Sequence, residues 1–221
     1  MTVLKWSFIR HVSGDGLRVD QAKVKAPLKM PAPTDKTGIQ RLLGMIQYLS
    51  KFLPHLSDMT KPLRDLTQQD VEWCWGDGQD SALKQIKEAV TRTPVLQYNN
   101  LEDEVTLQCD ASQHGLGAVL LQKGQPVPYA SRALTPTEIK YAQIEKELFA
   151  IVFACERFKA YMFGHDLVNM ETDQKPLEAI VLNPLHAAPL HRMLLRLQKF
   201  NLQIKYQKGD TDVPSGYTQQ G

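Results

Sequence analysis

The sequence has few cysteines and no pair of them at the spacing of a zinc site. Only three occur among 221 residues, and the six histidines add no zinc-ligand spacing. Cys74, Cys109 and Cys155 each lie in an apolar or aromatic run. We therefore expect free thiols in a reducing compartment and no structural zinc.

The sequence also lacks a long hydrophobic run and a strong charge of either sign. No stretch approaches the roughly 18 apolar residues of a membrane span, and the first residues contain no apolar signal segment. We expect no signal peptide, no transmembrane segment and no membrane partner, and an intracellular location in the cytoplasm or the nucleus. The net charge is only +2, so any nucleic-acid surface must be local.

The chain is long enough for one large domain or two small ones. Residues 1–34 carry glycines and prolines that predict a loosely organised segment. Residues 35–100 predict a small, mainly helical region, with a helix over 37–52 that Thr34 or Asp35 caps. The polar stretch "YNNLEDE" then marks a boundary, and residues 101–221 form the last predicted domain.

Beyond this boundary the apolar pattern changes to the period of two that is typical of strands. Three strands joined by tight turns predict an antiparallel meander. A long helix capped by Thr135 follows, then a fourth strand, two helices and a fifth strand. The predicted elements cover residues 105–110, 115–122, 127–134, 135–163, 166–173, 175–181, 190–200 and 201–207. Their order predicts an α/β fold of mixed α+β type: a five-stranded mixed sheet with flanking helices.

Three acids stand out by their position on these elements. Asp110 ends the first strand of the meander, Asp173 ends the fourth strand, and Glu147 lies in the long helix. If the two strands are neighbours under the helix, the three carboxylates converge at one edge of the sheet. Mg²⁺ prefers carboxylate oxygens, and two ions about 3.5–4 Å apart would promote phosphodiester hydrolysis.

Each acid also has an ordinary structural interpretation. Asp110 could be a turn residue, Glu147 an exposed helical glutamate beside Lys146, and Asp173 the N-cap of the next helix. The spacing of the three acids leaves both interpretations open.

Longer motifs add a family resemblance. The segments "CDASQHGLGAVLLQ", "EKELFAIVFA" and "ETDQKPLEAI" resemble the ribonuclease H (RNase H) domain of Ty3/Gypsy-type LTR retrotransposon Pol polyproteins. The preceding "IQRLLGMIQYLSKFLPHLSD" resembles the thumb and connection of the reverse transcriptase. Residues 1–34 resemble a remnant of the palm-to-thumb segment.

This resemblance implies an RNase H fold that hydrolyses the RNA strand of RNA–DNA hybrids by a two-metal mechanism. Mg²⁺, or Mn²⁺ in its place, is the implied cofactor, and Asp110, Glu147 and Asp173 match three of the family's four carboxylates. Gly216 occupies the position expected for the fourth, and Asp210 and Asp212 nearby do not match the motif.

The sequence departs from a complete reverse transcriptase in a second way. It contains no YxDD motif, so we expect no DNA synthesis by this chain alone. The chain resembles a fragment or a decayed copy, whose partners would be an RNA–DNA hybrid and the remainder of a reverse transcriptase polyprotein.

Further residues are candidates for contact with nucleic acid. Arg192, Arg196 and Lys199 follow helical spacing and could meet phosphates, although a solvated helix face explains them equally well. Gly44 resembles a thumb position that follows the minor groove, or it could serve helix packing. Small residues after Asp110, beginning with Gly115 and Gly117, are expected to let the backbone approach nucleic acid.

Three functional hypotheses remain. The first is an RNase H-type hydrolase, the second a catalytically inactive relic that keeps the fold and at most binds nucleic acid. In the third, a partner chain supplies the missing acid or the palm.

Overall fold

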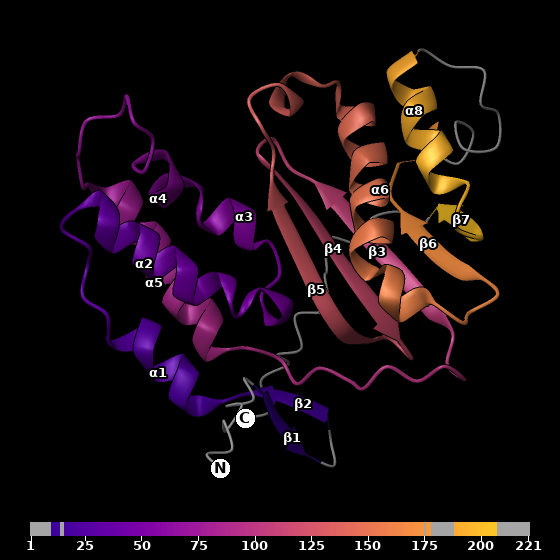
Figure 1. The fold of residues 1–221 in the computed structure, drawn as a ribbon, viewed down its shortest axis with the longest axis horizontal. Coiled ribbons are helices and arrows are strands. Elements are labelled where there is room, and N and C mark those ends of the chain that lie inside the picture. The colour runs from indigo at the N-terminus through magenta and orange to yellow at the C-terminus, as the bar shows by residue number, and fades with distance from the viewer. Residues whose placement is uncertain (1–9, 14–15, 175, 178–187, 207–221) are drawn as a thin grey trace, which may run out of the picture.

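The computed structural model describes residues 10–13, 16–174, 176–177 and 188–206, which form a helical region beside a mixed sheet (Figure 1). The elements before the sheet are β1 (Arg10–Ser13), β2 (Gly16–Val19), α1 (Gln21–Lys29), α2 (Lys36–Gln47), η1 (Ser50–Phe52), α3 (Leu56–Met59), α4 (Lys61–Asp65) and α5 (Asp77–Thr91). The Asp35 side chain accepts a hydrogen bond from the Gly38 N–H at 2.6 Å. Asp35 is therefore the cap of α2, one of the two predicted.

The five-stranded sheet has the order β5-β4-β3-β6-β7. Its elements are β3 (Val105–Ala111), β4 (Gly115–Gln122), β5 (Gln125–Ala133), η2 (Glu138–Lys140), α6 (Gln143–Met162), β6 (Val168–Thr172), α8 (Ala188–Leu197) and β7 (Leu202–Tyr206). β3, β4 and β5 are antiparallel, whereas β6 pairs parallel to both β3 and β7. This arrangement confirms the predicted mixed fold. The predicted helix over 175–181 lies mostly outside the described residues.

The described residues between 10 and 34 are more regular than the loosely organised segment that the sequence predicts. β1 and β2 form an antiparallel hairpin, and Leu17 of β2 exchanges backbone hydrogen bonds of 2.7 and 3.0 Å with Leu96. α1 continues through Pro27. A long-range partner such as Leu96, which local composition does not reveal, explains the difference.

The long helix begins at Gln143, seven residues later than a helix capped by Thr135 would. Thr135 instead caps the short η2 turn: its Oγ1 accepts from the Glu138 N–H, and its own N–H donates to the Glu138 carboxylate. Tyr141 and Ala142 are extended. The Glu145 carboxylate then accepts from the Ala142 N–H at 2.9 Å and starts α6.

The sheet is covered on both faces. α6 packs on one face over Leu107 and Leu120, and the helical region packs on the other over Val119 and Leu121. Burial on both faces explains why every residue of β4 is buried. The helical region shares its core with the sheet, so the packing marks no boundary near residue 100. The predicted division into domains there stays a prediction. Among the described helices, none has the length and apolar character needed to span a membrane.

Candidate functional site

The two strand-end acids lie at the same level of neighbouring parallel strands. Residues of β3 and β6 pair from Val105 with Val168 to Gln108 with Glu171. Asp110 is two residues beyond Gln108, and Asp173 is two residues beyond Glu171. Both side chains are exposed. The sheet register thus brings together two acids that are 63 positions apart in the chain.

Glu147 approaches this edge from α6, which crosses the sheet over β3 and β4 (Figure 1). Its side chain is only 6% exposed. Its Oε1 accepts a hydrogen bond of 2.5 Å from Nε2 of Gln143, which also donates to the Ala111 carbonyl at 3.0 Å. Gln143 therefore joins Glu147 to the end of β3.

The charges of Asp110 and Asp173 both act on the Glu147 carboxylate. The pKa of Glu147 rises from 4.5 to about 7, chiefly because burial penalises the charged form. The negative charges of Asp110 and Asp173 raise this pKa as well, whereas hydrogen bonds from Gln143 and Ala111 lower it. The site thus holds negative charge that the nearby side chains do not fully compensate.

The donor chemistry fits a divalent cation, but the side-chain positions do not yet enclose one. Within the described ranges, no group of three or more His, Cys, Asp or Glu side chains stands where it could hold a metal ion. The Glu147 carboxylate is engaged by Gln143 instead, while Asp110 and Asp173 are exposed. Coordination by all three acids would require their side chains to turn toward one another.

Sequence reasoning missed Gln143, although a signal was available. Gln143 lies four residues before Glu147 and therefore on the same face of α6. The adjacent Lys146 is 6% exposed, and its Nζ reaches the Gln113 carbonyl at 3.5 Å.

The predicted fourth position, Gly216, and the nearby Asp210 and Asp212 lie outside the described residues.

The small residues after Asp110 do not open a path for nucleic acid, contrary to the prediction. A Cβ atom at Gly115 would lie 2.3 Å from Oγ of Ser57, and one at Gly117 would lie 3.3 Å from Nδ1 of His55. Because these glycines have no side chains, the helical region can pack closely against the sheet.

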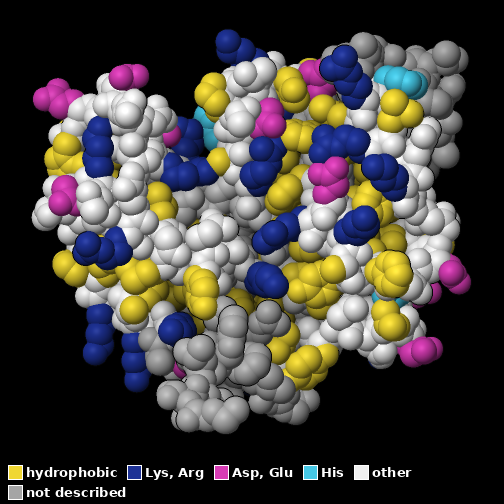
Figure 2. Space-filling view, in the orientation of Figure 1, with side chains coloured by type: hydrophobic (Ala, Val, Ile, Leu, Met, Phe, Trp, Pro, Cys, Tyr) yellow, Lys and Arg dark blue, Asp and Glu magenta, His cyan; other side chains and the backbone are white. Residues whose placement is uncertain are grey.

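Of the predicted basic stripe, Arg192 and Arg196 lie on α8, whereas Lys199 follows the end of this helix. Arg192, Arg196 and Lys199 are all exposed. However, Arg196 donates two hydrogen bonds to Glu156 of α6, at 2.9 and 2.7 Å, and lies 6.0 Å from the Phe149 ring centroid. Figure 2 shows Lys and Arg side chains gathered over the face that carries β5, α6 and α8, with acids among them. A contact of this stripe with phosphates stays a prediction.

Gly44 is exposed on α2, and a Cβ there would meet nothing within 4 Å. In the part of the chain that the structure describes, no helix packs against it. Of the two explanations that the sequence left open, helix packing thus has no partner here. An exposed glycine inside a helix lowers the stability of the folded state by roughly 0.5–1 kcal/mol relative to alanine. A close approach of another molecule to the backbone would account for a glycine at this position.

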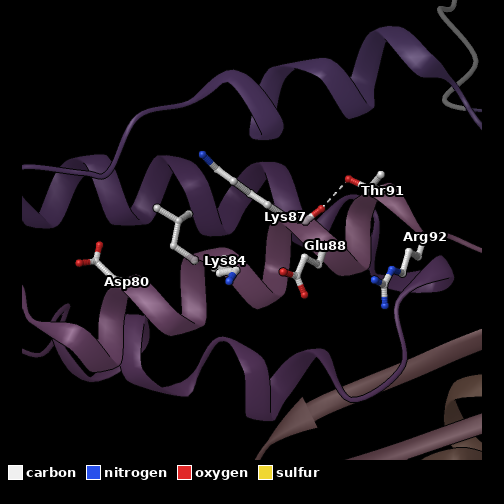
Figure 3. Close-up of a pocket in the computed structure, with 7 residues that line it drawn as sticks. Asp80, Lys84, Lys87, Glu88, Thr91 and Arg92 are labelled. Atoms are coloured by element: carbon white, nitrogen blue, oxygen red, sulfur yellow. Dashed lines mark hydrogen bonds between the residues drawn. The ribbon is translucent and has the colours of Figure 1, made fainter.

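A separate cavity of about 460 Å³ lies along α5, away from the three acids. Figure 3 shows Lys84, Lys87 and Arg92 along it together with Asp80 and Glu88. Nζ of Lys87 donates to the Met30 carbonyl at 2.8 Å. The mixed charges of this lining do not indicate one class of ligand.

Known proteins similar to this chain include retrotransposon polyproteins. Residues 75–169 match the family described as "RNase H-like domain found in reverse transcriptase". The Retrovirus-related Pol polyprotein from transposon 297 of Drosophila melanogaster is 34% identical over 92% of this chain. The transposon Tf2-3 polyprotein of Schizosaccharomyces pombe is 30% identical over 91% of it. The chain spans 19% and 16% of these two relatives, respectively.

A solved structure has the same fold. The foamy viral protease–reverse transcriptase in complex with an RNA/DNA hybrid superposes with a TM-score of 0.77, at 20% sequence identity. The match covers 97% of this chain and 31% of that one. At this identity the likeness establishes the fold alone.

Fold, register and sequence matches agree on the class of domain. The matched residues 75–169 carry α5, β3, β4, β5 and α6, and this part of the chain is an RNase H-like domain of the kind found in reverse transcriptases. Over nearly its whole length, the chain is similar to Pol polyproteins of Ty3/Gypsy-type LTR retrotransposons, which confirms the predicted resemblance.

Proposed function

We propose that this chain is a nuclease module that hydrolyses the RNA strand of RNA–DNA hybrids, as one part of a longer reverse transcriptase polyprotein. One observation carries the proposal. The buried Glu147 has a pKa of about 7, and Asp110 and Asp173, which help to raise it, lie at one level of two parallel strands. The foamy viral structure in complex with an RNA/DNA hybrid supports the choice of substrate.

Asp110, Glu147 and Asp173 would hold Mg²⁺, or Mn²⁺ in its place. The bound cation supplies charge neutralisation and an activated water for phosphodiester hydrolysis, in a two-metal mechanism if a second ion joins it. Gln143 orients the Glu147 carboxylate toward the end of β3. The 2′-OH groups of the substrate would distinguish RNA from DNA.

Incubating the full chain with an end-labelled RNA–DNA hybrid and Mg²⁺ or Mn²⁺ tests this proposal. We expect cleavage of the RNA strand by the wild type and none by Asp110→Asn, with double-stranded DNA left intact. Absence of cleavage by the wild type with either ion would refute the catalytic proposal. Equal cleavage by wild type and variant would indicate a contaminating nuclease.

We further propose that the exposed face of α2 around Gly44 approaches nucleic acid. Gly44→Ala should raise the free energy of unfolding by roughly 0.5–1 kcal/mol, because alanine favours the helix more than glycine does. It should also weaken binding of a hybrid, because the new methyl group keeps the nucleic acid away from the backbone. Urea unfolding and fluorescence anisotropy measure the two effects. Gly78→Ala in α5 is the matched control, because a Cβ at Gly78 also meets nothing within 4 Å. Equal binding by both variants would contradict this role.

A catalytically inactive relic that binds hybrids is the second candidate. The observation in its favour is that no described set of side chains encloses a metal position. This candidate predicts hybrid binding that depends neither on Asp110 nor on added cation. The same anisotropy measurement, made with Asp110→Asn and with EDTA, separates it from the nuclease.

A further inference from the structure

We propose that the segment His55–Asp58 of the helical region is a clamp that positions Asp110, and that Asp58 and Ser112 are positioning residues of the nuclease site. This inference rests on the proposed function and deepens it. It starts from contacts between the beginning of α3 and the β3–β4 turn, which begins at Ser112, two residues after Asp110.

Ser112 connects this turn to α3. Its Oγ donates a hydrogen bond of 2.7 Å to Oδ1 of Asp58 and accepts from the N–H groups of Gly115 at 2.8 Å and His114 at 3.2 Å. One hydroxyl thus closes the turn and attaches it to a side chain 54 positions earlier. Because Ser112 is two residues after Asp110, displacement of this turn would displace the end of β3.

Ser57 makes a second attachment, to β5. Its N–H donates to Oγ of Ser131 at 2.7 Å, and the Ser131 hydroxyl donates to Oγ of Ser57 at 2.6 Å. Ser57 is 4% exposed. Gly115 must lack a side chain here, since a Cβ would lie 2.3 Å from Oγ of Ser57 and 3.1 Å from Oδ1 of Asp58. Backbone and clamp are therefore in direct contact.

The clamp also reaches the strand partner of Asp110. His55 has a left-handed φ of 47°, and its Nδ1 lies 3.3 Å from the Cβ position of Gly117, which is the residue opposite Asp110 in the sheet. Arg64 donates to the Ser57 carbonyl. The charge of Asp58 acts on Arg64, so Asp58 has a cationic neighbour on its own side.

The consequence concerns the geometry of the carboxylates. A metal-binding constellation must be held to within about 0.5 Å, and loss of an outer-shell partner typically costs 10–100-fold in metal affinity or activity. Asp58→Ala should therefore lower kcat on the hybrid by about 10–100-fold, and raise the Mn²⁺ concentration at half-maximal rate, with KM for the hybrid unchanged.

The experiment compares full-length Asp58→Ala, Ser112→Ala and the double variant with the wild type. Because Asp58 acts on the turn through Ser112, the double variant should be no worse than Ser112→Ala alone. Asp58→Asn keeps an oxygen that can accept from Ser112 and should recover most of the rate. Asp70→Ala is the control, because it removes an exposed acid of the same helical region.

Deuterium exchange provides a measurement that does not depend on cleavage. The peptide covering residues 110–117 should exchange faster in Asp58→Ala and Ser112→Ala, and its exchange should be unchanged in Asp70→Ala. Wild-type exchange in both clamp variants would overturn the clamp, even if the wild type did not cleave. Faster exchange with wild-type kcat would overturn the positioning role. If the wild type does not cleave, the proposed function fails separately, and exchange alone decides whether the clamp exists.

Discussion

Asp110→Asn is expected to abolish the rise in melting temperature that Mn²⁺ gives the wild-type chain. A cation that binds only the folded state at about 100 times its dissociation constant adds about 2.7 kcal/mol of stability. For a chain of this length, that corresponds to a shift of roughly 5–10 °C. The amide cannot replace the carboxylate charge that the cation neutralises, so the variant should melt at the same temperature with and without Mn²⁺. The rate of hybrid cleavage by the same variant should fall on the order of 100-fold or more.

Glu171→Gln is the matched control for this titration. Glu171 lies two residues before Asp173 and bonds to Nε2 of Gln108 at 2.7 Å, so its loss should preserve the Mn²⁺ shift. Differential scanning fluorimetry of both variants over a range of Mn²⁺ concentrations measures the effect. A full shift in Asp110→Asn would place the bound ion elsewhere.

Glu147→Gln should remove activity and yet stabilise the metal-free protein above neutral pH. The folded-state pKa of Glu147 is about 7, above its ordinary 4.5, so the folded state retains a proton that the unfolded state has released. The associated stability is present below pH 4.5 and is lost as pH rises through about 7. The pKa difference corresponds to about 3 kcal/mol. A glutamine at this position does not titrate, so the variant does not lose this stability as pH rises. Its side-chain oxygen can still accept a hydrogen bond from Gln143.

Urea unfolding in EDTA between pH 4.5 and pH 8 measures this difference. Wild type minus Glu147→Gln should change by about 3 kcal/mol over that range. Glu145→Gln on the same helix is the control, since its side chain caps Ala142 at the half-exposed helix start, and it should keep the wild-type profile. Parallel pH curves for the wild type and Glu147→Gln would contradict the raised pKa.

Local patterns in the sequence predicted what depends on local physics. The alternation from Val105 identified β3 and placed Asp110 at its end, and the spacing of Ile39, Leu42 and Ile46 predicted α2, where all three are buried. The convergence of Asp110 with Asp173 needed a guess about strand neighbours, which the parallel β3–β6 register bears out. Its position on the long helix made Glu147 a candidate, but only the family resemblance favoured a metal ligand over an exposed helical glutamate.

Long-range partners could not be predicted in the same way. Gly115 correctly indicated a close approach, but its neighbour is Ser57 rather than nucleic acid. No periodicity links Asp58 to Ser112. Nothing in the sequence indicated that the exposed Arg196 pairs with Glu156 of α6. In each case the missing information was which distant segment packs alongside.

The central claim is that Asp110, Glu147 and Asp173 share a divalent cation, and anomalous diffraction from crystals of the full chain grown with Mn²⁺ tests it most directly. The account predicts an anomalous peak at the carboxyl ends of β3 and β6, with an oxygen from each of the three side chains about 2.1 Å from a metal ion. A peak elsewhere, or three carboxylates that stay apart in saturating Mn²⁺, would contradict it.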